Sequence, residues 1–116
     1  RKIYMVILKY YIMNFCRINL DEVYICDLAN TIEGVNARMA TPEEDCGYQK
    51  ADVVIEYNGE ISYLQVSHTP KSKGEIDRLA KRGTYPISTH KFRGMSISDN
   101  NLLLKIKTII KKWQKY

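Results

Sequence analysis

Residues 50–72, KADVVIEYNGEISYLQVSHTPKS, decide the fold class of this chain. β-Branched and aromatic residues, which favour strands, stand on both sides of the pair Asn58 and Gly59. An Asn-Gly pair favours a two-residue turn because both residues tolerate a positive φ. The stretch therefore predicts two antiparallel strands, over residues 51–57 and 60–68.

Polar side chains lie near the open end of this predicted hairpin. Asp52 opens the first strand, and Gln65 and Ser67 come late in the second. Side chains alternate between the two faces of a strand, so Gln65 and Ser67 share one face. Carboxylate and amide oxygens suit Mg²⁺, which keeps several of its waters in proteins. The pattern predicts a divalent-metal site formed by Asp52 and Gln65.

This layout resembles the PD-(D/E)xK nuclease superfamily, whose members have the restriction-endonuclease-like fold. In that family, an acid on one hairpin strand is followed, about a dozen residues later, by an acid or Gln, any residue and Lys. Asp52 matches the acid and Gln65 matches the less common Gln, with twelve residues between them. Ala51 stands where Pro is usual, and Ser67 stands where Lys is expected. The resemblance implies a nuclease in which Asp52 and Gln65 hold Mg²⁺ or Mn²⁺.

Ser67 is the main departure, because the family's Lys helps to position and activate the attacking water. Either a nearby lysine has taken over this role or the domain no longer cleaves. Lys71 and Lys73 follow Ser67 by four and six residues, and a long, mobile lysine side chain tolerates such a shift. Pro70 fixes the backbone just before Lys71, so Lys71 is the favoured replacement.

Helices are predicted around the hairpin. Apolar residues recur at steps of three and four over residues 20–38, which indicates a helix capped by Asn19 or Asp21. In the resembled family, a helix before the hairpin often carries a further acid, and Glu33 is the candidate for this additional catalytic and metal-binding acid. A polar loop follows over residues 40–50. The later elements are a helix over 75–82, a strand over 85–89 and a closing helix over 99–115.

These elements predict an α/β (α+β) fold, with a central mixed sheet flanked by helices. Their order matches the αβββαβ core of the restriction-endonuclease-like fold if a further short strand lies near residues 46–49. That core would cover about residues 20–90, and the C-terminal helix would be an addition to it. The chain has 116 residues and neither repeats nor linkers, so residues 1–116 are expected to form a single domain.

The charge of the chain favours nucleic acid as its partner. With 18 basic and 13 acidic residues the net charge is +5, and a basic surplus attracts polyanions. Basic residues around the predicted site are candidates for phosphate contacts, which position a nucleic acid without reading its sequence. These residues are Lys71, Lys73, Lys81 and Arg82. We expect His68 and His90 to have structural roles.

The cysteines and the N-terminal segment bear on location. Three cysteines without a C-x-x-C pair favour reduced thiols in a cytoplasmic protein and argue against zinc. Residues 3–15 are apolar, but polar residues interrupt them and no small-residue cleavage site follows. This segment is too short and polar to span a membrane. Its periodicity fits either a buried helix or a buried strand, and we favour a helix over residues 2–16.

Three classes of function follow from these observations. The first is a Mg²⁺- or Mn²⁺-dependent nuclease that acts on DNA or RNA. The second is a catalytically inactive nucleic-acid-binding module on the same fold, because the expected lysine is missing. The third is a protein-interaction domain, which the nine tyrosines favour. Related nucleases are often dimers, so a homodimer is a further alternative to a monomer.

Overall fold

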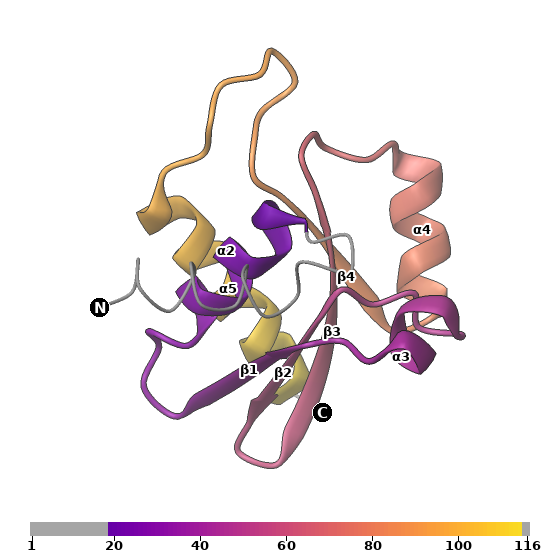
Figure 1. The fold of residues 1–116 in the computed structure, drawn as a ribbon, viewed down its shortest axis with the longest axis vertical. Helices are drawn as coiled ribbons and strands as arrows, with labels where there is room; N and C mark the ends of the chain where they lie inside the picture. Colours follow the sequence, from indigo (N-terminus) through magenta and orange to yellow (C-terminus); the bar gives the residue numbers. More distant parts are fainter. Residues whose placement is uncertain (1–18, 115–116) are drawn as a thin grey trace.

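A four-stranded mixed sheet forms the centre of the computed structural model, which describes residues 19–114 (Figure 1). The strands are β1 (Val35–Met39), β2 (Val53–Tyr57), β3 (Glu60–Ser67) and β4 (Thr84–Ser88), and they lie side by side in this order. The first three strands pair antiparallel, whereas β4 pairs parallel with β3. The predicted mixed α/β class, with a mixed sheet flanked by helices, is confirmed.

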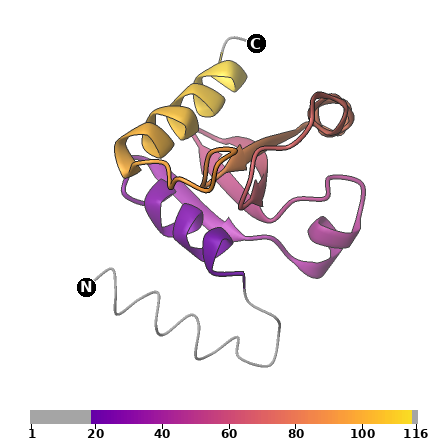
Figure 2. The same cartoon turned by 90° about the horizontal axis from the view of Figure 1, so that it is seen from above.

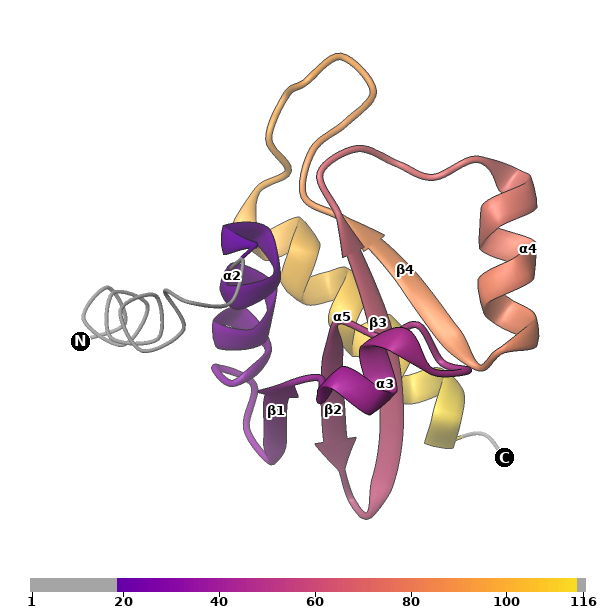
Figure 3. The ribbon, with the colours of Figure 1, turned by 45° about the vertical axis from the view of Figure 1, so that its right-hand side comes forward.

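Helices cover both faces of the sheet. On one face, α2 (Leu20–Ala29) and α5 (Asp99–Gln114) pack against each other and against the strands (Figure 2). On the other face, α4 (Lys73–Lys81) packs beside β4, which it connects to β3. The short helix α3 (Pro42–Cys46) precedes β2 and lies on the α4 side of the sheet (Figure 3).

The predicted hairpin is confirmed almost residue for residue. The φ angles of Asn58 and Gly59 are 52° and 79°, which is the two-residue turn expected from this pair. Val53 lies opposite Leu64 in the β2–β3 register, and both side chains are fully buried. Because side chains alternate along a strand, Gln65 faces away from this core, toward α4.

The hydrophobic core lies between the sheet and the pair α2 and α5. Side chains from both helices interlock with the inward residues of the strands. Its most buried members include Ile25, Ile55, Leu64, Leu102 and Ile106. Packing in this core therefore holds the first turn of α2 near the start of β2 and the end of β3.

The predicted helix over residues 20–38 is wrong beyond Ala29, because residues 35–39 form β1. Side chains four residues apart lie on one face of a helix and also on one face of a strand. The apolar spacing therefore could not show where the helix ends and the strand begins. Asn30 ends the helix: its amide accepts a hydrogen bond from Ala37 N (2.7 Å) and donates one to Ala37 O (2.9 Å). Gly34 completes the turn with a φ of 81°.

The predicted extra strand near residues 46–49 is also wrong. The third strand of the meander is β1, and α3 occupies the polar loop instead. Thr41 and Glu44 form a reciprocal capping box at the start of α3, and Pro42 lies in its first turn, which together favour a helix start. The other elements were predicted to within about two residues of their bounds, whereas the helix predicted over residues 2–16 lies outside the described residues.

Candidate functional site

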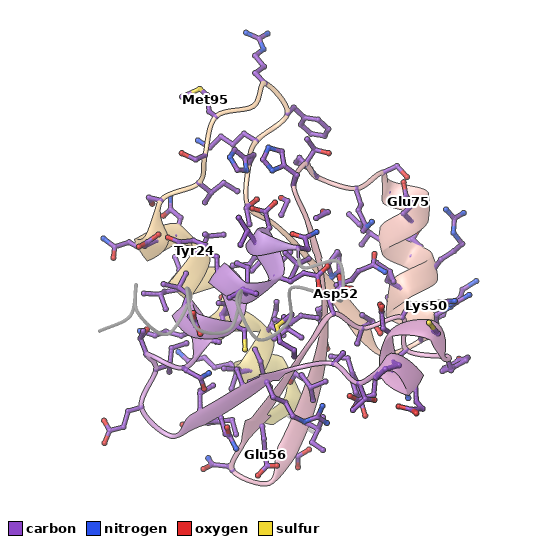
Figure 4. The ribbon with its side chains drawn as sticks, in the orientation of Figure 1. Tyr24, Lys50, Asp52, Glu56, Glu75 and Met95 are labelled. Carbon is purple, nitrogen blue, oxygen red and sulfur yellow. The ribbon has the colours of Figure 1, made fainter. Side chains whose placement is uncertain are left out.

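Acidic side chains from three elements meet where β2 begins and β3 ends. Antiparallel pairing places the start of β2 beside the end of β3. Asp52 directly precedes β2, and its Oδ2 accepts a hydrogen bond from Val66 N (2.8 Å). Figure 4 shows Asp52 between the helices that flank the sheet. Glu22 approaches from the first turn of α2, and Asp45 approaches from α3.

The surroundings of Asp52 disfavour its charged form. Partial burial raises the pKa of Asp52 to about 6, although the hydrogen bond from Val66 N opposes this. The charge of Asp45 and a hydrogen bond with its side chain raise the pKa further, whereas the charge of Lys71 lowers it. Asp52 therefore shares its site with a second acid and one nearby cation.

The pKa of Glu22 is raised even further than that of Asp52. Burial is the main cause that raises its pKa to about 7, and the negative charges of Asp52, Asp45 and Asp21 add to the shift. Sequence reasoning missed Glu22 and Asp45. An acid in the first turn of a helix is ordinary, because it interacts favourably with the helix dipole, so no pattern in the sequence distinguished Glu22. We refer to Glu22, Asp45 and Asp52 as the carboxylate cluster.

Gln65 lies next to Asp52 in the strand register but binds a different partner. Its Nε2 donates a hydrogen bond to Lys50 O (3.0 Å). Lys50 has a φ of 53°, a left-handed conformation that non-glycine residues seldom adopt. The Gln65 amide thus stabilises the left-handed backbone of Lys50, which lies two residues before Asp52. Ala51, between them, is fully buried. On the other side, Gln65 lines a shallow hollow beneath α4.

Lys71 lies in the loop between β3 and α4, close enough to Asp52 for their charges to interact. Its side chain is only 20% exposed, and its Nζ lies 3.6 Å from Glu75 Oε2. Its charge acts on the Asp52 carboxylate and lowers the pKa of that group. Ser67 has a local role, because its Oγ donates a hydrogen bond to Thr69 O (2.7 Å).

Glu33 does not join the carboxylate cluster. It lies exposed in the turn between α2 and β1, beyond the end of α2 that is opposite Glu22. A helix of this length spans about 15 Å, so Glu22 and Glu33 lie at opposite ends of α2. Helix α2 contributes Glu22, and not the predicted Glu33, to the carboxylate cluster.

The proposed phosphate contacts divide between the two ends of α4. Lys73 is exposed at its start, and Lys71 precedes it. At the other end, the Arg82 guanidinium lies 6.0 Å from the centre of the Tyr48 ring. The Tyr48 hydroxyl also donates a hydrogen bond to the backbone oxygen of Lys81. Basic residues therefore lie at both ends of α4, with Glu75 and Asp77 between them.

His68 and His90 form a contact that links three segments at the same end of the sheet. Their rings stack at 3.7 Å between centroids, and His68 Nδ1 lies 3.0 Å from Asp21 Oδ2. This pair holds the start of α2 to the ends of β3 and β4. The arrangement agrees with the structural roles expected for both histidines.

Three further observations concern metal ligands, membrane-spanning helices and similarity to known proteins. Over residues 19–114, no group of three or more His, Cys, Asp and Glu side chains is arranged to hold a metal ion by itself. Within the same part of the chain, every helix is too short or too polar to cross a membrane. Comparisons of the chain with protein-family models, curated proteins and solved structures find no match.

Proposed function

We propose that this protein is a divalent-metal-dependent nuclease with a restriction-endonuclease-like core. The observation that carries this proposal is the carboxylate cluster beside Lys71. Burial and mutual repulsion raise the pKa values of Glu22 and Asp52 to about 7 and about 6. Such shifts, arising from desolvation together with specific charged neighbours, are frequent at functional sites.

The order of the elements supports the proposed core. Leaving out the short α3, the chain runs α2, three antiparallel strands, α4 and a strand parallel to β3. This is the αβββαβ order that the resemblance implies. Asp52 directly precedes the second strand and Gln65 lies in the third, which supports the proposed match to the motif.

The residues present fit a hydrated Mg²⁺ or Mn²⁺ better than a fully caged ion. Mg²⁺ in nucleases and polymerases is bound by one or two carboxylates, by waters and by substrate phosphates. Asp52 and Asp45 are the closest pair, and Glu22 adds charge nearby. Burial and neighbouring negative charges raise the pKa values of these acids. A cation there would favour their charged forms and so counteract this rise.

Each residue then has a distinct role. Asp52 and Asp45 would hold the ion, with Glu22 adding negative charge nearby, and the ion would supply an activated water and stabilise charge on the scissile phosphate. Lys71 reaches the same place from the loop before α4 and would orient the water or the phosphate oxygen. Gln65 positions Lys50 and thereby the backbone that carries Asp52.

The test is cleavage of single-stranded and duplex DNA and RNA in the presence of Mn²⁺ or Mg²⁺. We expect weak metal-dependent cleavage by the wild type and none by Asp52→Asn, which keeps the shape of the side chain. Glu33→Gln is the matched control, because Glu33 lies away from the cluster and its loss should leave cleavage unchanged. Equal cleavage by Asp52→Asn and the wild type would reject the proposed site.

Ser67 favours a second candidate, a binding module on the same fold that no longer cleaves. Under this alternative the wild type is inert toward every substrate, yet it binds nucleic acid. The variant Ser67→Lys would then gain metal-dependent cleavage. Loss of both cleavage and binding in both proteins would reject the two nucleic-acid functions together and favour a protein-interaction domain.

A further inference from the structure

A cavity of about 390 Å³ opens between β4, α5 and the loop after β3. Its inner surface is apolar, with Tyr85, Ile87, Leu102 and Ile109 contributed by the strand and the helix. Ligand-binding cavities commonly measure 300–1,000 Å³ and combine apolar walls with a few polar groups. This cavity is therefore large enough for one small organic ligand.

Polar groups surround this apolar surface. Ser67 and Ser88 line the strand side, and Asn101 lines the helix side. Two cations, Lys71 and Lys105, also line the cavity, and none of its described lining residues is acidic. The lining thus complements a ligand with an apolar body, hydrogen-bonding edges and a negative group.

Lys71 connects the cavity to the proposed nuclease site. Its side chain lines the cavity, and its charge also lowers the pKa of Asp52. A ligand whose negative group lies beside Lys71 would therefore present that group to the carboxylate cluster. In a nucleic acid, the group placed in this way is a phosphate, and the body attached to it is a nucleoside, whose base has two apolar faces.

We propose that this cavity binds a single nucleoside monophosphate unit, with its base against the apolar surface and its phosphate near Lys71 and Lys105. This identity of the ligand rests on the proposed nuclease function. The unit is the terminal nucleotide of a strand or a nucleotide turned out of a duplex, because stacked bases within a helix do not enter a cavity. An acyl chain fits less well, since it would make no hydrogen bonds with the polar edge that Ser67, Ser88 and Asn101 give the cavity.

The test measures binding of adenosine 5′-monophosphate by isothermal titration calorimetry in metal-free buffer with EDTA. We expect Asn101→Trp, which fills the cavity from an exposed helix position, to abolish binding. Lys105→Ala should weaken binding about five- to tenfold, because it removes one of two charges from the phosphate. Asn100→Trp and Lys107→Ala are matched controls on the same helix, outside the cavity lining, and should bind like the wild type.

Three further probes decide the chemistry. Adenosine and inorganic phosphate should each bind at least tenfold more weakly than the monophosphate, because each retains only half of the contacts. Equal binding of inorganic phosphate would overturn the proposal, since it would show an anion site only. Tighter binding of decanoate would overturn it in favour of an acyl ligand. Binding that Asn101→Trp leaves unchanged would place the ligand elsewhere and overturn it as well.

The outcome is separable from that of the nuclease proposal. Asp52→Asn should retain monophosphate binding in EDTA, because Asp52 does not line the cavity. Nucleotide binding without cleavage would support the proposed nucleotide-binding cavity and reject the proposed nuclease function. Metal-dependent cleavage without monophosphate binding would keep the nuclease and reject the cavity.

Discussion

Glu22 is a partly buried acid whose surroundings strongly disfavour its charged form. Its pKa rises from 4.5 to about 7 on folding, so the folded state binds this proton more tightly than the unfolded state does. The associated stability is fully present below about pH 4.5 and is lost as the pH rises through about 7. Above pH 7 the folded protein therefore holds a partly buried charge among other acids.

Replacing this carboxylate should stabilise the protein at alkaline pH. We expect Glu22→Gln to raise the free energy of unfolding at pH 8 by about 1 to 2 kcal/mol, after allowance for solvent screening of a half-exposed group. At pH 5 the gain should nearly vanish, because Glu22 is then largely protonated. Urea unfolding at both pH values measures this, with exposed Glu33→Gln as the control. A gain of the same size at pH 5 and pH 8 would contradict the assigned pKa shift.

Lys71 should matter for the chemical step. It is the mostly buried cation whose charge acts on Asp52, so its loss removes a positive charge from the place where phosphate charge develops. We expect Lys71→Ala to lower the rate constant of metal-dependent cleavage at least tenfold. Lys73→Ala, with an exposed lysine at the start of the same helix, is the control and should keep at least half of the activity. Equal losses in the two variants would remove Lys71 from the site.

At the scale of elements, the hairpin was predictable because local chemistry determines it. Asn58 and Gly59 favour their turn wherever they occur, and the strands on either side are rich in β-branched residues. The region from Asn30 to β1 was not predictable, because the side chain of Asn30 pairs with the backbone of Ala37 only after folding. Asp52 could be proposed from its place in the sequence pattern, whereas Glu22 joins the carboxylate cluster only through packing of α2 on the sheet.

Helix α4 offers an element-scale test of nucleic-acid binding. Lys81 and Arg82 lie at the end of α4 away from Lys71, at a distance of about 12 Å along the helix. If both contact phosphates, the double variant Lys81→Ala/Arg82→Ala should reduce the slope of log K against log salt by up to about two. Fluorescence anisotropy with labelled DNA and RNA at several salt concentrations measures the slope. Lys107→Ala/Lys111→Ala on α5 is the matched control, and an unchanged slope in the α4 variant would move the contact elsewhere.

For the whole molecule, charge is distributed unevenly between surface and site. The net charge of +5 favours approach of a polyanion. The carboxylate cluster would repel the same polyanion at close range unless a cation lies between them. Under the proposed function, a divalent ion would have two effects: it would join the phosphate to the protein, and it would stabilise a fold that otherwise keeps several acids close together.

That second effect gives a prediction independent of cleavage. An ion that binds only the folded state raises stability by RT ln(1 + [ion]/Kd), so an ion at about ten times its Kd should raise the melting temperature by roughly 5 °C for a domain of this size. We expect this rise with Mn²⁺ at pH 8 and a much smaller one at pH 5, because Glu22 and Asp52, with pKa values of about 7 and about 6, are then largely protonated and protons compete with the ion. Asp52→Asn should lose the rise at pH 8, whereas Glu33→Gln should keep it. Scanning calorimetry at the two pH values measures all three proteins, and an equal rise in Asp52→Asn and the wild type would show that Mn²⁺ binds outside the carboxylate cluster.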